Sequence, residues 1–420
     1  MSEALTDLSL PRRLASVFAD YGAVVRSRRY LPLWLGQLIS NFGDTLHYIA
    51  LVVLVFEISG QGLAVAGLVA AETIPVLALG PVAGVVIDRF SRKGVLIGAD
   101  LVRAALALSL VWPQGVWHAY LVAAGLSAAG VFFNPTVNAV LPALTTERQR
   151  LAANSVTWST AQLVQIVGAS VAAGILALVG TSAAFALNAA SFVASAALIT
   201  LLRIPRPAPQ AAGEAGGALR RFWVDLRHGL SYAARDAFVS RLLLVQSLAA
   251  FAVGATGAML VVLSERHLRL PPEGFATLIG AIGVGALLGP LIPNALARDY
   301  RSARWLFVPY LIRGVGDVLI AVFMPLPIAL VILFIYGLNT STGMVVFNST
   351  IQGAIPDAVR GRIFTLLDID WSIFTLLSLA IGGGFVDRFG VEPLFWSGGT
   401  LLALAGLLGL VLFRRTRFRG

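Results

Sequence analysis

The sequence predicts an all-α membrane protein in which twelve transmembrane helices form two pseudo-symmetric six-helix halves. Three observations support this prediction. Apolar residues make up 58% of the 420 residues and charged residues only 12%, whereas a soluble domain is about half apolar and about a quarter charged. The apolar residues gather in runs of the ~20 residues that a helix needs to cross a bilayer. The second half of the chain partly repeats the first. This composition excludes a soluble enzyme.

Apolar runs bounded by charged residues, Gly or Pro define the candidate spans. In chain order they lie near 31–57, 64–87, 95–112, 118–140, 151–178, 182–202, 238–263, 274–297, 305–325, 327–350, 361–386 and 393–413. The spans group into an N-terminal half, 31–202, and a C-terminal half, 238–413.

Three polar segments flank the two halves. Residues 1–30 carry five arginines and lack the apolar core and cleavage site of a secretory signal, so we expect them on the inner membrane surface. Residues 203–237 begin Pro- and Gly-rich and continue as a basic amphipathic stretch, which predicts a cytoplasmic linker with a surface helix. Residues 414–420 form a basic tail. Of the 31 basic residues, 26 fall on the side of the N-terminus, which predicts that both termini are cytoplasmic in a plasma (inner) membrane protein.

An internal repeat supports the division into halves. The stretch F-N-P-T-V-N-A-V-L-P, Phe133 to Pro142, recurs as F-N-S-T-I-Q-G-A-I-P, Phe347 to Pro356. Repeats of this type in transporters place the substrate site near the bilayer midplane between the halves, which open it alternately to each side by rocking.

The composition also excludes several chemistries. Cysteine is absent and the four histidines are scattered, so no metal site is expected. The only lysine, Lys93, is followed by Gly94 and Val95, which does not fit the phosphate-binding loop of an ATP-driven pump. The basic residues flank the spans, so no nucleic-acid partner is expected. No nucleophile, base and orienting group occur together, so we expect neither an enzyme nor a cofactor.

The loop after the second span reads G-V-V-I-D-R-F-S-R-K-G and resembles the signature of the major facilitator superfamily. The signature positions are Gly84, Asp88, Arg89, Arg92 and Lys93. In this interpretation Asp88 and the cations form a cytoplasmic latch that bridges to a neighbouring helix end in one rocking state, while topology alone accounts for Lys93. Two further patterns, F-G-D-x-L-x-x-I-A-L from Phe42 and A-A-N-S from Ala152, are similar to the branch of macrolide-efflux proteins and the enterobactin exporter.

This resemblance implies a secondary transporter that exports small molecules against inward proton flow. The chain departs from the family pattern in two places. The fourth span lacks the arginine of many proton-coupled relatives, and the fifth reads G-A-S-V-A-A-G, from Gly168, where antiporters carry Gly-Pro.

Ionisable residues inside the spans are the candidate coupling groups, since each is costly in a membrane unless it is paired or faces water. The acids are Asp44, Glu72, Asp100, Asp317, Asp368 and Asp370. Asp44 belongs to a polar stripe on one face of the first span, with Gln37, Asn41 and Tyr48, and His47 lies beside it. Its helix has no cation, so burial favours the protonated acid. Asp44 is therefore the first candidate for the coupling proton and Glu72 the second; a static hydrogen bond is the alternative role for Asp44.

The remaining polar residues have two possible roles. Asp100 with Arg103, and Arg313 with Asp317, are spaced to pair on one helix face, where they either neutralise each other or take part in transport. Asp368 and Asp370 cannot share a face. A further set lines the cavity or joins helices by hydrogen bonds. This set comprises Ser127, Asn134 and Asn138 in the fourth span and Ser341, Asn348 and Gln352 in the tenth.

We therefore expect a monomeric multidrug-type exporter whose partners are a small-molecule substrate, protons and the lipid bilayer. An apolar cavity with few fixed charges suits lipophilic or cationic cargo, while an anionic cargo would require Arg103 and Arg313. The alternatives are a lysophospholipid flippase or a siderophore exporter of the same fold, favoured if an arginine faces a lateral opening to lipid. A membrane receptor that does not transport is a further alternative.

Overall fold

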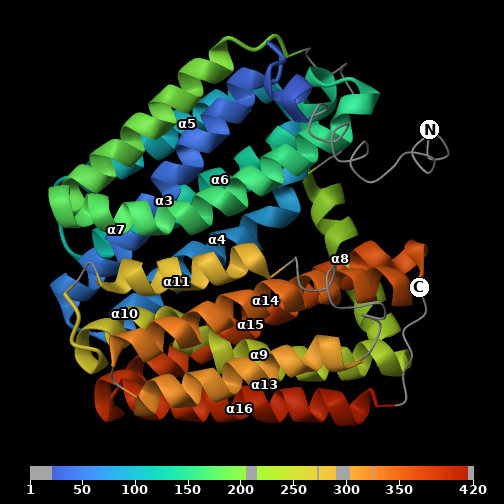
Figure 1. The fold of residues 1–420 in the computed structure, drawn as a ribbon. Helices are drawn as coiled ribbons and strands as arrows, with labels where there is room; N and C mark the ends of the chain where they lie inside the picture. Colours follow the sequence, from blue (N-terminus) through green and yellow to red (C-terminus); the bar gives the residue numbers. More distant parts are fainter. Residues whose placement is uncertain (1–20, 205–214, 272–273, 290–302, 324, 415–420) are drawn as a thin grey trace, which may run out of the picture.

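A computed structural model of the chain describes residues 21–204, 215–271, 274–289, 303–323 and 325–414. Within these ranges the secondary structure is helical, with no strand, and nine helical segments are long and apolar enough to cross a membrane. Figure 1 shows the N-terminal helices, blue to green, lying above the C-terminal helices, yellow to red. The chain is therefore a multi-pass helical membrane protein. The predicted basic segment 1–30 and tail 414–420 lie mostly outside the described residues.

The N-terminal helices follow the predicted spans closely. They are α3 (Leu31–Ser59), α4 (Gly62–Arg89), α5 (Arg92–Ser109), α6 (Val116–Leu144) and α7 (Glu147–Thr200). Two predicted spans, 151–178 and 182–202, are joined in α7 and separated only by a kink at Gly180, whose φ of 76° is in the left-handed region that favours glycine. No loop separates the two spans: the chain bends at Gly180, and the backbone is helical on both sides of this residue.

The C-terminal helices are more interrupted. They are α9 (Ala237–Ala258), α10 (Leu260–Val262), the π-helix η1 (Leu263–His267), α11 (Gly274–Leu288), α13 (Ala303–Val322), α14 (Leu326–Ala354), α15 (Asp357–Phe389) and α16 (Val391–Leu412). The predicted span 238–263 is broken at Met259, where α9 ends and α10 begins. The predicted span 274–297 is described only as far as Gly289.

Helix α8 (Ala215–Arg235) occupies the predicted amphipathic stretch between the halves. It contacts α4, α9 and α15, and its Asp225 Oδ1 accepts a hydrogen bond from Arg362 Nε of α15 at 2.7 Å. Figure 1 shows α8 at one end of the bundle, away from the α3–α4 connection and α10. The ion pair ties the connecting helix to the C-terminal half at that end.

Each half is held by its own helix contacts, and a smaller set joins the halves. In the N-terminal half α3 and α5 pack on α7, and α4 packs on α6; in the C-terminal half α13 packs on α16, α11 on α14, and α9 on α15 and α16. The halves meet where α7 contacts α11 and α4 contacts α15, and where α3 contacts α10. The interface between halves is therefore built from helices that the repeat places in matching positions.

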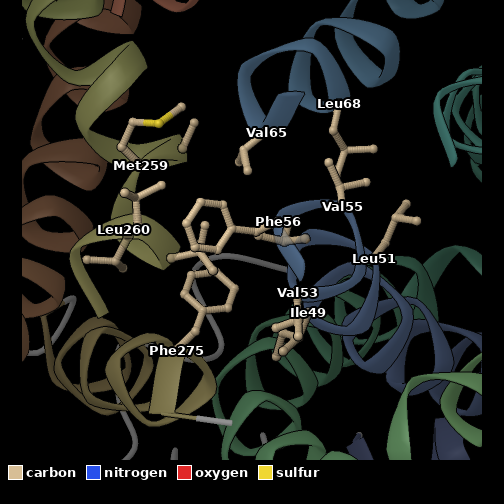
Figure 2. Close-up of a cluster of buried hydrophobic side chains, with 14 of the residues drawn as sticks. Ile49, Leu51, Val53, Val55, Phe56, Val65, Leu68, Met259, Leu260 and Phe275 are labelled. Carbon is tan, nitrogen blue, oxygen red and sulfur yellow. The ribbon is translucent and has the colours of Figure 1, made fainter. Parts of the chain in front are cut away.

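An apolar plug closes the interface at the end away from α8. Its members come from both halves (Figure 2): Ile49, Leu51, Val53, Val55, Phe56, Val65 and Leu68 from α3 and α4, with Met259, Leu260 and Phe275 from the C-terminal half. All are buried, and Figure 2 shows Phe56 pointing from α3 toward Leu260 and Phe275. Burial of these side chains excludes water from this end of the molecule.

A candidate transport cavity between the halves

A cavity of about 510 Å³ lies between the two halves. Ile49 and Leu260 line it and also belong to the apolar plug, so the plug forms one end wall. Most of the lining is apolar and comes from α3, α9, α10, α11, α13, α14 and α16. The polar lining residues are Asp44, Thr45, Tyr48, Thr256, Arg313, Asp317 and Tyr336. A largely apolar cavity of this size with a few convergent polar groups is typical of a small-molecule site.

Asp44 and Tyr48, two members of the predicted polar stripe, both face this cavity. They lie one helical turn apart on α3, so the local helix geometry alone puts them on one face. Asp44 is close enough to Arg103 and Asp100 of α5 to interact with them electrostatically, although its own helix carries no cation. The polar stripe therefore reaches the cavity through Asp44 and Tyr48.

The other members of the stripe do not line the cavity. Gln37 and Asn41 are half-buried nearer the start of α3, and Gln37 Oε1 has no hydrogen-bond partner among the described residues. His47 is 4% exposed and packs edge-on against Phe185 of α7, with ring centroids 5.1 Å apart. Its two ring nitrogens have no partner in the described structure, so His47 is a buried packing residue at this position.

Glu72 of α4 is half-buried and does not line the cavity. It lies within electrostatic range of both Asp44 and Tyr48. Its backbone carbonyl accepts a hydrogen bond from Ser127 Oγ of α6 at 2.5 Å, which joins α4 to α6. Ser127 therefore connects α4 to α6, and the Glu72 side chain is not part of the cavity lining.

The two predicted ion pairs differ. Asp100 Oδ1 and Arg103 Nη2 are 2.5 Å apart and both residues are buried, with the guanidinium 4.1 Å from the ring centre of Phe133 and 4.5 Å from that of Phe192. The second pair is a correction to the prediction. Within the described structure no direct N–O contact joins Arg313 to Asp317, although the two charges are close enough to interact electrostatically, and both side chains line the cavity.

Tyr336 of α14 accounts for this difference, because the Arg313 guanidinium lies over its ring at 4.1 Å from the centroid. A guanidinium over an aromatic face is attracted by the ring quadrupole. Arg313 Nε and Asp317 Oδ2 are buried without hydrogen-bond partners among the described residues. Both charged side chains line the cavity and can interact with whatever occupies it.

A second cavity, of about 340 Å³, lies between α13 and α14 on the outer surface of the molecule. Its lining includes the exposed apolar side chains of Ile312 and Val315. Four residues line both cavities: Arg313, Asp317, Leu333 and Tyr336. These four side chains form a single wall between the central cavity and an apolar surface groove that would face lipid.

The other predicted polar residues lie elsewhere. Asn134 and Asn138 are exposed on α6 and do not line the central cavity. Asp370 Oδ1 accepts a hydrogen bond from Ser247 Oγ of α9 at 2.8 Å, whereas Asp368 is exposed. The side chains of Asn348 and Gln352 lie outside the described residues.

The loop motif is described only in part. Arg92 Nη1 donates to the carbonyl of Ala139 at 3.0 Å, and Lys93 Nζ donates to the carbonyls of Thr200 and Leu202 at 2.6 and 2.9 Å. These contacts fasten α5 to α6 and to the end of α7, all within the N-terminal half, and a cation at a helix C-terminus is stabilising. The side chains of the other motif residues, at Gly84, Asp88 and Arg89, lie outside the described part of the chain.

Sequence patterns missed several residues of the site, among them three that lie outside every predicted pattern. Tyr336 and Thr256 line the cavity, and the fully buried Asn188 of α7 lies against Gly43 on the helix that carries Asp44. None of them stands in a polar stripe or a repeat. Their neighbours come from helices distant in sequence, so only the packing of the helices identifies them.

Comparisons with known proteins agree with this architecture. The family model of the Major Facilitator Superfamily matches residues 33–367. Macrolide efflux protein A of Streptococcus pyogenes is 23% identical over 382 residues, which cover 89% of this chain and 93% of that protein. The multidrug efflux pump Tap of Mycolicibacterium fortuitum is 25% identical over 401 residues, which cover 91% of this chain and 95% of that protein.

Solved structures show the same fold at low identity. The nucleoside transporter NupG has a TM-score of 0.76 at 11% identity, over 91% of this chain and 99% of that chain. A bacterial homologue of the iron transporter ferroportin, in an inward-facing state, has a TM-score of 0.71 at 17% identity, over 92% of this chain and 98% of that chain. The predicted all-helical membrane fold and the predicted family resemblance are both confirmed; the nine candidate spans among the described residues are consistent with the predicted twelve. With two helical halves around a shared cavity and a family match over most of its length, the chain belongs to the Major Facilitator Superfamily.

Proposed function

We propose that the protein exports small amphiphilic or lipophilic molecules from the cytoplasm by proton antiport with alternating access. The observation that carries this proposal is the position of Asp44 in the largely apolar cavity between the halves. An acid in that position binds either a proton or the positive end of a cargo molecule, and the apolar lining receives the rest of the cargo.

In this mechanism the proton and the cargo compete for Asp44. Protonation from the outside neutralises the acid and favours return to the inward-facing state. Cargo that enters from the cytoplasm displaces the proton and is carried outward as 31–202 and 238–413 rock against each other. The names of two relatives, a macrolide efflux protein and a multidrug efflux pump, support export of this kind of cargo.

The proposed orientation places both termini in the cytoplasm of the plasma (inner) membrane, with a monomer as the transporting unit. The orientation rests on the excess of basic residues on the side of the N-terminus. In this orientation the apolar plug closes the outer side of the cavity.

Transport into proteoliposomes tests the proposal. We would measure movement of fluorescent lipophilic cations and neutral amphiphiles with and without an imposed pH gradient, comparing the native chain with Asp44→Asn. The gradient-driven rate should fall at least about tenfold in Asp44→Asn, because the neutral amide cannot exchange a proton. Asp225→Asn is the matched control: it removes a carboxylate from α8, outside the cavity, and should keep the native rate.

Gradient-driven transport that persists at the native rate in Asp44→Asn would exclude Asp44 as the proton carrier. Transport that ignores the gradient in the native chain would indicate facilitated diffusion or another coupling ion.

A second candidate is movement of an anionic or zwitterionic amphiphile such as a lysophospholipid. The observation that favours it is the wall between the central cavity and the lipid-facing groove, in which Arg313 lies over Tyr336. A headgroup phosphate would pair with Arg313 while the acyl chain lies in the groove between α13 and α14. In the same liposomes, flipping of a fluorescent lysophospholipid that is lost in Arg313→Gln and kept in Arg313→Lys would select this candidate.

A further inference from the structure

Asp387, at the end of α15, holds the start of α4 across the interface between the halves. Its Oδ1 accepts the backbone N–H of Gly62 at 2.6 Å, and its Oδ2 accepts that of Leu63 at 2.9 Å. The first N–H groups of a helix have no partner within the helix, and the helix dipole favours an anion there. One carboxylate from the C-terminal half thus satisfies two donors of the N-terminal half.

A second contact crosses the interface beside the first. Arg266 of η1 donates through Nη2 to the carbonyl of Gly60, in the turn between α3 and α4. Its guanidinium also lies 5.4 Å from the ring centre of Phe56, a member of the apolar plug. The α3–α4 turn is therefore held from two elements of the other half, α15 and η1.

Close helix packing accompanies these contacts. A Cβ atom added at Gly383 would lie 2.7 Å from the Cα of Leu63 and 2.9 Å from the Cβ of Ala66, so only glycine allows α15 to approach α4 this closely. The polar contacts and the packing involve the α3–α4 turn and the start of α4, next to the plug residues Phe56 and Val65.

The sequence around Asp387 repeats the loop motif. Residues 383–389 read G-G-F-V-D-R-F, and residues 84–90 read G-V-V-I-D-R-F, so both have the form G-x-x-[IV]-D-R-F. The first copy ends α4 and the second ends α15. Helices α4 and α15 pack together. They run in opposite directions, because the end of α15 lies at the start of α4. Helix α8 contacts both helices. The two copies therefore lie at opposite ends of one helix pair.

We propose that Asp387 and Arg266 form a latch, on the outer side in the proposed orientation, which clamps the α3–α4 turn (Gly60, Gly62 and Leu63) and holds the apolar plug closed. Two properties suit a latch that must also release. Asp387 is exposed, so water can replace the backbone donors when the halves separate. All the hydrogen bonds use backbone groups of the turn, so rocking of one half breaks them together.

A cysteine-labelling experiment tests the latch without any cargo or proton gradient, so failure of the proposed export activity would not affect it. The chain contains no cysteine, so Val53→Cys introduces a single thiol. Val53 is a plug residue, 1% exposed. The rate of its reaction with a membrane-impermeant maleimide would be measured in right-side-out and in inside-out membrane vesicles, which covers either orientation of the protein.

The latch predicts a graded response. In the Val53→Cys background, Asp387→Ala should raise the labelling rate about tenfold from the plug side only, because two charge-assisted hydrogen bonds are lost. Asp387→Asn keeps one carbonyl acceptor and should give a smaller increase, and Arg266→Gln should raise the rate independently. Arg388→Gln is the matched control: this guanidinium lies 5.7 Å from the ring centre of Phe389 in its own half, so the rate should stay at the parent value.

Size-exclusion elution of each purified variant would establish that it is folded. Folded Asp387→Ala and Arg266→Gln variants with the parent labelling rate on both sides would overturn the latch. An equal increase in Arg388→Gln would also overturn it, since the effect would then reflect general loosening of the α15 terminus.

Discussion

Arg103 on α5 and Arg313 on α13, which lie 210 residues apart, half the length of the chain, have opposite surroundings. Arg103 is sealed between two phenylalanine rings and paired with Asp100, which is 0% exposed. Arg313 lies over one tyrosine, faces a cavity and lacks an ion pair among the described residues. The same residue type is therefore structural in one half and available to a ligand in the other.

This difference predicts unequal effects on stability. Arg103→Leu should lower the free energy of unfolding by about 3–5 kcal/mol, because it leaves a buried carboxylate without its partner. Arg313→Leu should cost only about 1 kcal/mol, the value of a cation–ring contact. Unfolding of the purified variants in mixed detergent and SDS micelles measures both values.

The double variant Asp100→Asn/Arg103→Leu provides the internal control. It should recover part of the loss, since it removes the uncompensated charge. If Arg103→Leu and Arg313→Leu proved equally stable, the buried pair would have no special structural role.

At the scale of helices, the contact between α11 and α14 depends on two glycines. An added Cβ at Gly285 would collide with the backbone of Phe334, and one at Gly337 would collide with the backbone of Ile282. Both helices carry residues that line the cavity, so the close approach of α11 and α14 sets the width of the cavity where the C-terminal half forms its wall. Small residues at such crossings let backbones approach in the absence of a hydrophobic driving force between helices.

Gly337→Leu should therefore force α14 away from α11 and lower the melting temperature in detergent, with a loss of about 1–3 kcal/mol typical of overpacking. Gly98→Ala on α5 is the control: nothing lies within 4 Å of its added Cβ, so the melting temperature should stay the same or rise slightly. A Gly337→Leu protein as stable as the parent would show that α14 has room to move.

At the scale of the whole molecule, the closed end also contains a half-buried acid, Glu265, that is close enough to a second acid for the two charges to repel each other. Burial first, and then the negative charge of Glu57 on α3, raise the pKa of Glu265 in η1 above its ordinary value, while Arg266 beside it acts in the other direction. Glu57 and Glu265 belong to different halves, so their repulsion opposes the closed state when both are charged. Opening exposes Glu265 to water and returns its pKa toward the ordinary value.

The raised pKa of Glu265 makes closure of this end depend on pH. The closed state binds the Glu265 proton more tightly than the open state, so acid favours closure; the cost to the closed state grows as the pH rises above the ordinary pKa and is complete above the raised pKa. Glu265→Gln should therefore slow maleimide labelling of Val53→Cys near neutral pH. The difference between Glu265→Gln and its parent should disappear as the pH falls to the ordinary carboxyl range, where Glu265 is neutral in both states. A difference that persists unchanged into acid would assign the effect to packing and not to charge.

Most of the fold follows from the sequence because its signals are local. Runs of apolar residues define the helices, since an isolated backbone in lipid must satisfy its own hydrogen bonds. Asp44 and Tyr48 are predicted together because residues four apart share a helix face. The Asp100–Arg103 pair is equally local, since three residues separate the partners.

The tertiary structure alone decided which groups meet between distant helices. It placed Arg313 over the ring of Tyr336, left Glu72 out of the cavity lining and joined Asp387 to the start of α4, 325 residues away. Spacing along one helix fixes which side chains share a face, but the neighbour of that face depends on how helices from two halves pack. The sequence by itself therefore determined the class of protein, the helices and the acid on α3, whereas the cavity wall and the closure of one end depend on contacts that form only when the halves assemble.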